Sequence, residues 1–338
     1  MKVSIIAFTD NGMNLANKLA NNLDNDSISV NEINLTRCEK GGLSTWTEEH
    51  FSTSDALVFI GALGIAVRAV SPFIKTKVND PAVVVVDELG RFSIPVLSGH
   101  IGGANELAIQ ISKILDCVPV ITTATDINNL FAVDTWAKSQ GLGILNPENI
   151  KLVSSKLLEG KTVNIKSDYP IKGDLPKNIQ LNSSDTDYDV IISHKNHDYD
   201  KEGNALFLIP SIITAGIGCR RGVDSEIIED SVLNAVNKEN CHILSLNSIA
   251  SIDKKANEKG ILEFSEKYCL PFTTFTADEL NSLEGDFTKS DFVKSVVEVD
   301  NVCERSAVYK SRGKLLRKKD AGHGVTVALA IKDPELSW

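Results

Sequence analysis

The 338-residue sequence lacks several features that mark specialised classes of protein. Its 6 cysteines are scattered and no two lie within four residues of each other, which fits neither a zinc ribbon nor a small disulfide scaffold. No stretch reaches ~18 uninterrupted apolar residues, so the sequence predicts no membrane span. Basic residues are outnumbered, with 35 Lys and Arg against 45 Asp and Glu and a net charge of −10. This balance argues against non-specific nucleic-acid binding, which depends on a broad basic face.

What is present is typical of a globular protein. Hydrophobic residues make up 42% and charged residues 24%, which excludes a wholly disordered chain. The length corresponds to about two or three domains. The β-like run Val3–Phe8 leads directly into Asp10-Asn-Gly12, so we expect a first strand there and not a signal peptide. We therefore expect a soluble, cytoplasmic protein with reduced thiols.

The pattern along the chain predicts an α/β fold in three regions. An N-terminal α/β domain over 1–136 and a C-terminal one over 206–338 alternate apolar runs with helical patterns, which favours mainly parallel sheets. The more polar region 137–205 predicts a small central α/β insertion with long loops, whose strands the pattern does not place. The predicted strands are Val3–Phe8, Ala56–Ile60, Ala82–Val86, Phe92–Val96, Pro119–Thr122, Leu206–Ile209, Ile243–Leu246 and Val325–Ile331, and the predicted C-terminal helices include Asp224–Val236 and Lys255–Tyr268.

Ligands of such sheets bind beyond the carboxyl ends of strands, and the most informative segment follows one of them. Here Ser98-Gly-His-Ile-Gly-Gly103 forms a glycine-rich turn into a helix, whose N-terminus offers free N–H groups to an anion. His100 is the candidate general base, because an imidazole titrates near neutrality, and Glu106 is a candidate to orient it. The candidate ligand contacts are Ser98, Gly99, Gly102, Gly103 and Asn105. A turn with only a helix-capping role fits the pattern about equally well.

Two other segments place glycines close to arginine, a combination suited to a carboxylate or phosphate. One follows the strand ending at Ile60 and the other opens the C-terminal region. The candidate anion contacts are Gly61, Gly64, Arg68, Gly218, Arg220 and Arg221. Taken alone, the first is more typical of a βα turn with a surface arginine.

A fourth segment, Thr123-Ala-Thr-Asp126, ends another predicted strand with hydroxyls and a carboxylate, and Asp134 follows. These side chains are suited to accept hydrogen bonds from a ligand or to cap the next helix, and capping is favoured for Asp126 alone. By contrast, His194 and His197 are expected in a solvated loop. Cys219, beside two arginines, is expected to have a lowered pKa.

Four of these motifs, Gly61–Arg68, Leu97–Ala108, Thr123–Asp126 and Gly216–Gly222, together resemble the cobalt-precorrin-5A hydrolase family of anaerobic cobalamin biosynthesis. The C-terminal segments Ser248–Gly260 and Gly324–Ala330 extend the resemblance, whereas Cys303–Ala307 departs from the family's alanine-rich pattern. The resemblance covers residues 52–136 and 214–332.

The resemblance implies an enzyme that opens the ring A δ-lactone of a cobalt tetrapyrrole and releases a two-carbon unit as acetaldehyde. It implies a small-molecule cobalt-tetrapyrrole substrate, which itself carries the cobalt, so no cofactor is expected. Transient contact with neighbouring pathway enzymes is expected, but neither nucleic acid nor a membrane.

Our hypothesis for the roles of the residues comes from the chemistry and not from the resemblance. His100 acts as general base, and the N–H groups of Gly102 and Gly103 stabilise the oxyanion. Glu106 or Asp126 supports the base, and no residue is expected to bind a metal. The arginines hold the substrate's carboxylates, in a cleft expected between the N- and C-terminal regions.

Two other classes of function remain open. One is a non-catalytic carrier of a tetrapyrrole intermediate. The other is an unrelated α/β enzyme that binds a nucleotide phosphate, against which the absence of a P-loop and of a Gly-x-Gly-x-x-Gly motif after the first strand counts.

Overall fold

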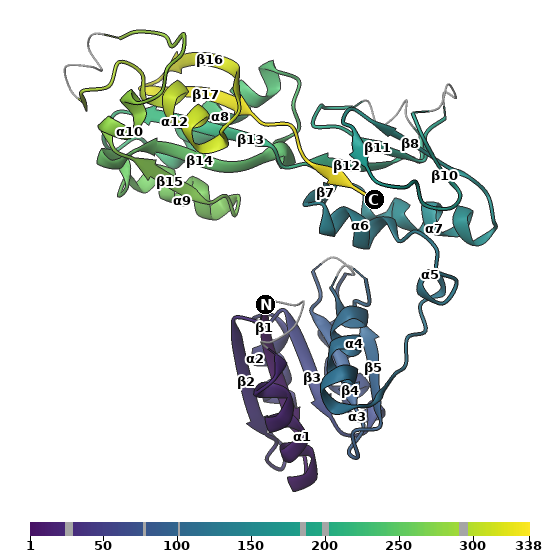
Figure 1. Cartoon of the computed structure of the whole chain (residues 1–338). Coiled ribbons are helices and arrows are strands. Elements are labelled where there is room, and N and C mark those ends of the chain that lie inside the picture. Colours follow the sequence, from purple (N-terminus) through teal and green to yellow (C-terminus); the bar gives the residue numbers. More distant parts are fainter. Residues whose placement is uncertain (24–29, 77–78, 101, 183–186, 198–202, 291–296) are drawn as a thin grey trace. The chain divides into compact units, whose positions relative to one another are not determined.

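The computed structural model describes residues 1–23, 30–76, 79–100, 102–182, 187–197, 203–290 and 297–338 (Figure 1). The chain forms two compact units, Met1–Thr135 and Trp136–Trp338. Both are α/β with mainly parallel sheets, as predicted. The second unit contains a central and a C-terminal sheet, and the expected domain boundaries within the chain stay a prediction.

The first unit is built on a six-stranded sheet in the order β2-β1-β3-β4-β5-β6. All neighbouring strands are parallel except β4 and β5. The strands are β1 (Lys2–Ala7), β2 (Glu32–Arg37), β3 (Ala56–Ile60), β4 (Ala82–Val86), β5 (Phe92–Leu97) and β6 (Val118–Pro119). The helices are α1 (Asp10–Ala20), α2 (Leu43–Phe51), α3 (Leu63–Val70), α4 (Ala104–Leu115), α5 (Ala124–Ile127) and α6 (Val133–Ser139), the last of which ends in the second unit.

Helices cover both faces of this sheet, which explains its apolar central strands. Successive side chains of a strand point to opposite faces. Val58 and Val84 therefore pack in the cluster that includes α1 and α4, whereas Phe59 and Val85 pack in the cluster that includes α2 and α3. Every residue of β4 is buried, as its unbroken apolar run predicted.

Strand β5 runs antiparallel to β4, and this direction separates two glycine-containing turns. The sequence analysis placed both of them after the end of a strand, one after Ile60 and one after Leu97. Leu97 pairs with Val83 near the start of β4, so the turn that follows Leu97 lies at the amino ends of β3 and β4. Gly61 follows the carboxyl end of β3, where its N–H donates to Val86 O. A five-residue strand is about 17 Å long. The turn around His100 and the turn leading to Arg68 therefore occupy opposite ends of the sheet.

The central sheet of the second unit has the order β10-β8-β11-β12-β7 and is parallel except for β7. It confirms the predicted central α/β region and places the strands that the sequence pattern did not place. Its elements are β7 (Leu142–Ile144), η2 (Pro147–Asn149), α7 (Ile150–Leu158), β8 (Val163–Ser167), β10 (Ile179–Leu181), β11 (Val190–Ile192) and β12 (Leu206–Pro210), and a short pair joins β9 (Ile171–Lys172) to β18 (Leu336–Ser337).

The C-terminal sheet has the order β15-β14-β13-β17-β16. Strands β13, β14 and β15 are parallel, and the β16–β17 hairpin adds an antiparallel edge. Its elements are β13 (Ile213–Cys219), α8 (Ser225–Lys238), η3 (Ile243–Ser245), β14 (Leu246–Ile252), η4 (Asp253–Lys255), α9 (Lys259–Lys267), β15 (Phe272–Phe275), α10 (Ala277–Asn281), α12 (Val302–Ser311), β16 (Lys314–Gly322) and β17 (Val325–Ile331).

Most predicted elements agree with the structure, but three predictions were wrong. The strand expected over Pro119–Thr122 is regular only to Pro119. The one expected over Ile243–Leu246 is a 3-10 turn, after which β14 begins at Leu246. The helix expected from Lys255 begins at Lys259. In each case the sequence pattern gave the right region but not the residue at which regular hydrogen bonding begins or ends.

The sequence analysis expected His194 in a solvated loop, but the structure shows this residue half-buried. The Tyr169 hydroxyl contacts His194 Nδ1, and burial lowers the pKa of this histidine.

Candidate active site

The turn between β5 and α4 holds its shape through its own backbone. Ser98 has a left-handed φ of 56°, and its hydroxyl donates to Asp80 O at 2.9 Å. A Cβ on Gly102 would lie 2.3 Å from Ser98 Cβ, so only glycine fits there. The N–H of Gly103 donates to His100 O at 2.9 Å. The glycines therefore serve the compactness of the turn, and the Gly103 N–H expected at an oxyanion is already bonded.

This turn places His100 between two carboxylates. His100 Nε2 lies 3.0 Å from Asp126 Oδ2, and His100 Nδ1 lies 3.3 Å from Asp134 Oδ2. Thr125 Oγ1 also lies 3.3 Å from Nε2. Because both ring nitrogens face acceptors, the doubly protonated imidazolium is the form that satisfies both contacts.

The three side chains form a gradient from interior to solvent. The exposed fraction is 9% for the Asp134 side chain, 17% for His100 and 36% for Asp126. The hydrogen bond to Asp134 raises the pKa of His100, with burial opposing and the charges of both aspartates adding. Burial alone would raise the pKa of Asp134, but its contacts with His100 outweigh that and lower it. The two carboxylates thus favour the imidazolium form of His100 to a higher pH than in a free histidine.

Asn105 fixes the outer carboxylate. Its side-chain amide donates to Asp126 Oδ2 at 2.7 Å and to Thr123 Oγ1 at 2.9 Å. Asp126 Oδ2 therefore accepts from both His100 and Asn105, whereas no described residue hydrogen-bonds to its Oδ1. The arrangement leaves one carboxylate oxygen available to accept a proton beside an imidazolium able to donate one.

The structure brings together only part of the predicted site. His100, Asn105, Thr123 and Asp126 meet at the carboxyl ends of β5 and β6, and Ser98, Gly99, Gly102 and Gly103 form the supporting turn. Glu106 is exposed on α4, and the carboxylates that contact His100 belong to other residues.

The Gly61–Arg68 segment lies at the other end of the sheet. The Phe8 ring would be 2.8 Å from a Cβ on Gly61, so packing explains that glycine. The Arg68 guanidinium lies close to Gly64, 3.5 Å from where its Cβ would be.

A second candidate site lies in the C-terminal sheet at the carboxyl ends of β13 and β14, where ligands of parallel sheets bind. It is a pocket of about 750 Å³, within the range of small-molecule sites. Apolar side chains contribute much of the lining, among them Ile252, Val302 and Val325. The predicted contacts Gly218, Arg220 and Arg221 all line it.

The charge of this pocket is the reverse of the charge of the chain. Its described lining contains Arg220, Arg221, Lys255 and Lys319 but no Asp or Glu. Lys255 pairs with Glu258 at 2.8 Å. Among the described residues, no carboxylate forms an ion pair with the other three cations. The pocket therefore combines an apolar surface with cations available to an anionic ligand.

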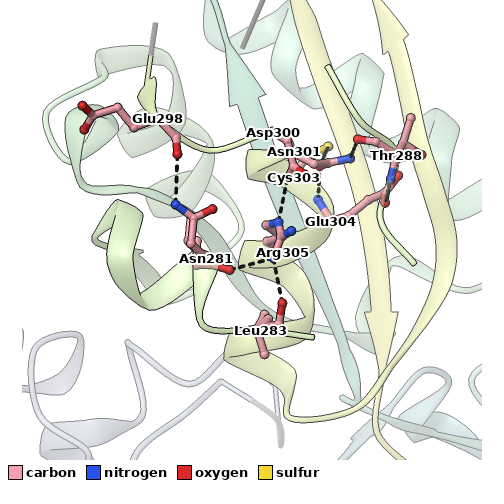
Figure 2. A network of polar contacts seen from close by, with 10 residues as sticks. Asn281, Leu283, Thr288, Glu298, Asp300, Asn301, Cys303, Glu304 and Arg305 are labelled. Atoms are coloured by element: carbon pink, nitrogen blue, oxygen red, sulfur yellow. Dashed lines mark hydrogen bonds and ion pairs between the residues drawn. The ribbon is translucent and has the colours of Figure 1, made fainter. Parts of the chain in front are cut away.

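One wall of the pocket, residues 301–303 at the start of α12, is held by a buried polar network (Figure 2). Glu304 is fully buried, and it accepts the N–H groups of Thr288 at 2.9 Å and Lys319 at 2.7 Å. Arg305 binds Asp300 at 2.8 Å and donates to Leu280 O and Leu283 O. Asn301 caps the helix by accepting from Glu304 N. This network fixes the backbone of Lys319, one of the pocket's cations.

Cys219 differs from the sequence expectation. Burial raises the pKa of its thiol, although Lys255 partly opposes this, so the neighbouring arginines do not produce a thiolate. Those arginines are exposed and their charges are solvated. All six cysteines are free.

Sequence reasoning missed two sets of residues. The first is Asp134, which was expected to bind a ligand or to cap a helix, whereas it contacts His100. The second comprises Lys255, Lys319 and His323, which line the C-terminal pocket but were not assigned to any site. The only available signal for Asp134 was a carboxylate in the first turn of α6. In the described part of the chain, no group of three or more His, Cys, Asp or Glu is placed to hold a metal ion, and no helix is long and apolar enough to cross a membrane.

Comparison with known proteins places three family models along the chain. The Cobalamin synthesis G N-terminal model matches residues 45–126, the Cobalamin biosynthesis central region matches 131–210, and the Cobalamin synthesis G C-terminus matches 213–330.

Curated relatives match over most of their length. The cobalt-precorrin-5A hydrolase of Salmonella typhimurium is 34% identical, over 86% of each chain. The enzyme of the same name from Priestia megaterium is 29% identical, over 98% of this chain and 95% of its own. Among solved structures, a cobalamin biosynthesis protein G homologue from Sulfolobus solfataricus is 26% identical, covering 98% of this chain and 97% of its own, with a TM-score of 0.43.

Proposed function

Since the chain belongs to the cobalamin synthesis G family, whose curated members are named cobalt-precorrin-5A hydrolases, we propose that it hydrolyses cobalt-precorrin-5A. The substrate is a cobalt tetrapyrrole with a ring A δ-lactone, and the product is cobalt-precorrin-5B with release of acetaldehyde. The observation that carries the proposal is the His100–Asp126 pair, with Asp126 Oδ1 available beside an imidazolium.

In the first step, water attacks the lactone carbonyl carbon. Asp126 accepts a proton from the water, and His100 stabilises the oxyanion that forms. The ester C–O bond then breaks, and the departing alkoxide takes a proton from the His100 imidazolium. This step yields a free carboxylic acid, a hydroxyl group and a neutral imidazole.

In the second step, the neutral His100 accepts the proton of the new hydroxyl group. A C=O bond forms, the adjacent C–C bond breaks and acetaldehyde leaves. The bonding electrons enter the conjugated macrocycle, which supplies the electron sink itself, and the proton held by Asp126 is available to balance the charge. His100 thus donates a proton in the first step and recovers one in the second.

The C-terminal pocket is the proposed binding site for the macrocycle. A tetrapyrrole has a large apolar ring edged by acetate and propionate groups. The apolar lining suits the ring, and Arg220, Arg221 and Lys319 suit the carboxylates. Such local cations are what an acidic protein needs in order to bind a polyanion.

A carrier function is the second candidate, because a pocket that suits the macrocycle is compatible with binding alone. The two are separated by measuring acetaldehyde released from anaerobically prepared cobalt-precorrin-5A, with and without the protein. Release that rises in proportion to protein concentration supports the hydrolase. Binding without faster release than in buffer would establish the carrier and overturn the hydrolase.

A further inference from the structure

His323 lies at the tip of the β16–β17 hairpin in a backbone conformation that side chains seldom adopt. Its φ is 48°, and the φ of Gly324 is 82°. Two successive residues with positive φ at the centre of a two-residue hairpin define a type I′ turn, whose first position favours Asn, Asp or Gly. The turn thus presents an imidazole where a smaller residue is more usual.

The hairpin tip is fixed against the pocket. Arg220 N donates to Gly324 O at 2.8 Å, which ties the tip to the end of β13. His323 lines the pocket and is exposed, and no described residue hydrogen-bonds to its imidazole. A lone pair of a ring nitrogen is therefore available to a ligand in the pocket.

The other soft donors of the pocket are poor metal ligands. Burial raises the pKa of Cys219, and it raises the pKa of Cys303 to about 12. Both thiols stay protonated near neutrality, whereas metal binding requires a thiolate. His323 is the only histidine in the described lining. Neutral imidazole is the commonest protein ligand for transition metals.

We propose that His323 binds the substrate's cobalt as an axial ligand when the macrocycle occupies the C-terminal pocket. This inference rests on the proposed function, since the cobalt arrives with the substrate. One ring nitrogen donates its lone pair to the metal, and no bond within the macrocycle changes. Arg220 and Arg221 hold carboxylates at the ring's edge while His323 selects the face of the ring that is bound.

The test uses two stable probes, cobalt(II) uroporphyrin and metal-free uroporphyrin, which share the ring and its carboxylates. Low-spin cobalt(II) has one unpaired electron, so one axial nitrogen splits its electron paramagnetic resonance lines into triplets. Under anaerobic conditions we expect this splitting with the wild-type protein and its loss in His323→Asn. Asn suits the same turn, so the hairpin should be retained. Affinity for the cobalt probe should fall about tenfold, and affinity for the metal-free probe should not change.

His100→Gln is the matched control and should keep the splitting. Retention of the splitting in His323→Asn would overturn the proposal. Equal loss of affinity for both probes would also overturn it, because it would indicate a hydrogen bond to the ring's edge. If the wild-type protein bound neither probe, the proposed macrocycle pocket would fail as well, whereas normal metal-free binding without nitrogen splitting would overturn the axial ligand alone.

Discussion

His100 Nδ1 lies 3.3 Å from Asp134 Oδ2, and this contact joins the turn between β5 and α4 to the first turn of α6. Asp134 Oδ1 accepts the Thr135 N–H at 2.9 Å, so the carboxylate is itself held in place. The buried Asp134 raises the pKa of His100 and orients its ring, while the more exposed Asp126 faces solvent. His100 thus has one buried and one partly exposed carboxylate partner.

The first prediction concerns the pH dependence of activity. In our mechanism His100 starts protonated, so kcat/KM should fall as pH rises through a His100 pKa that lies above the ordinary 6.5. In Asp134→Asn the pKa of His100 should drop, and the fall in kcat/KM should move to lower pH. Asp116→Asn, an exposed aspartate after α4, is the control. An unchanged profile in Asp134→Asn would show that Asp134 does not tune His100.

The second prediction concerns stability. The raised pKa of His100 stabilises the fold below about pH 6.5, and this contribution is lost as pH rises through the raised value. The lowered pKa of Asp134 stabilises the fold above about pH 3.8, and this is lost as pH falls through the lowered value. Urea denaturation should therefore show the largest difference between wild type and Asp134→Asn, about 1 kcal/mol, between these two pH values. A difference independent of pH would point to packing and not to charge.

The third prediction concerns the cationic pocket. Arg220→Gln and Arg221→Gln should each weaken cobalt-precorrin-5A binding about tenfold, because each removes a charge-assisted hydrogen bond. Raising the ionic strength should weaken wild-type binding more than that of the variants. Arg312→Gln, at an exposed arginine that follows α12, provides the comparison. Titration followed by absorbance measures all three, and equal affinities would remove the arginines from the binding site.

The fourth prediction concerns the buried network of Figure 2. Glu304→Gln leaves one of two backbone N–H groups facing an amide NH₂ group, so the free energy of unfolding should fall by about 1–3 kcal/mol. The exposed Glu298→Gln should change it little. Because the substitution weakens the network that fixes the Lys319 backbone, affinity for the metal-free macrocycle should also fall in conditions where the variant stays folded. Full stability in Glu304→Gln would show that one of the two bonds is dispensable.

The fold was predictable where local signals and burial agree. The strands Ala56–Ile60, Ala82–Val86 and Val325–Ile331 appear with the predicted bounds, because unbroken apolar runs between turns leave little choice. The direction of β5 was not predictable in this way. Its reversal depends on pairing with β4, and it alone separates Arg68 from His100.

The side chains that meet in the candidate site were predictable by residue type more than by contact. His100 and Asp126 were identified because a glycine-rich turn and a strand end drew attention to them. The role of Asp134 depends on the path of the chain from α5 to α6, which no local pattern encodes. The wall around Lys319 and His323 likewise forms only when the hairpin packs beside β13.

The most direct test of the account is single-turnover release of acetaldehyde from cobalt-precorrin-5A by the wild-type protein and by Asp126→Asn. Loss of a general base lowers rates by about 10²–10⁴-fold. We predict a loss of that size in Asp126→Asn with substrate binding retained, since the pocket is untouched. Equal rates for the two proteins would contradict the assignment of the His100–Asp126 pair as the catalytic centre.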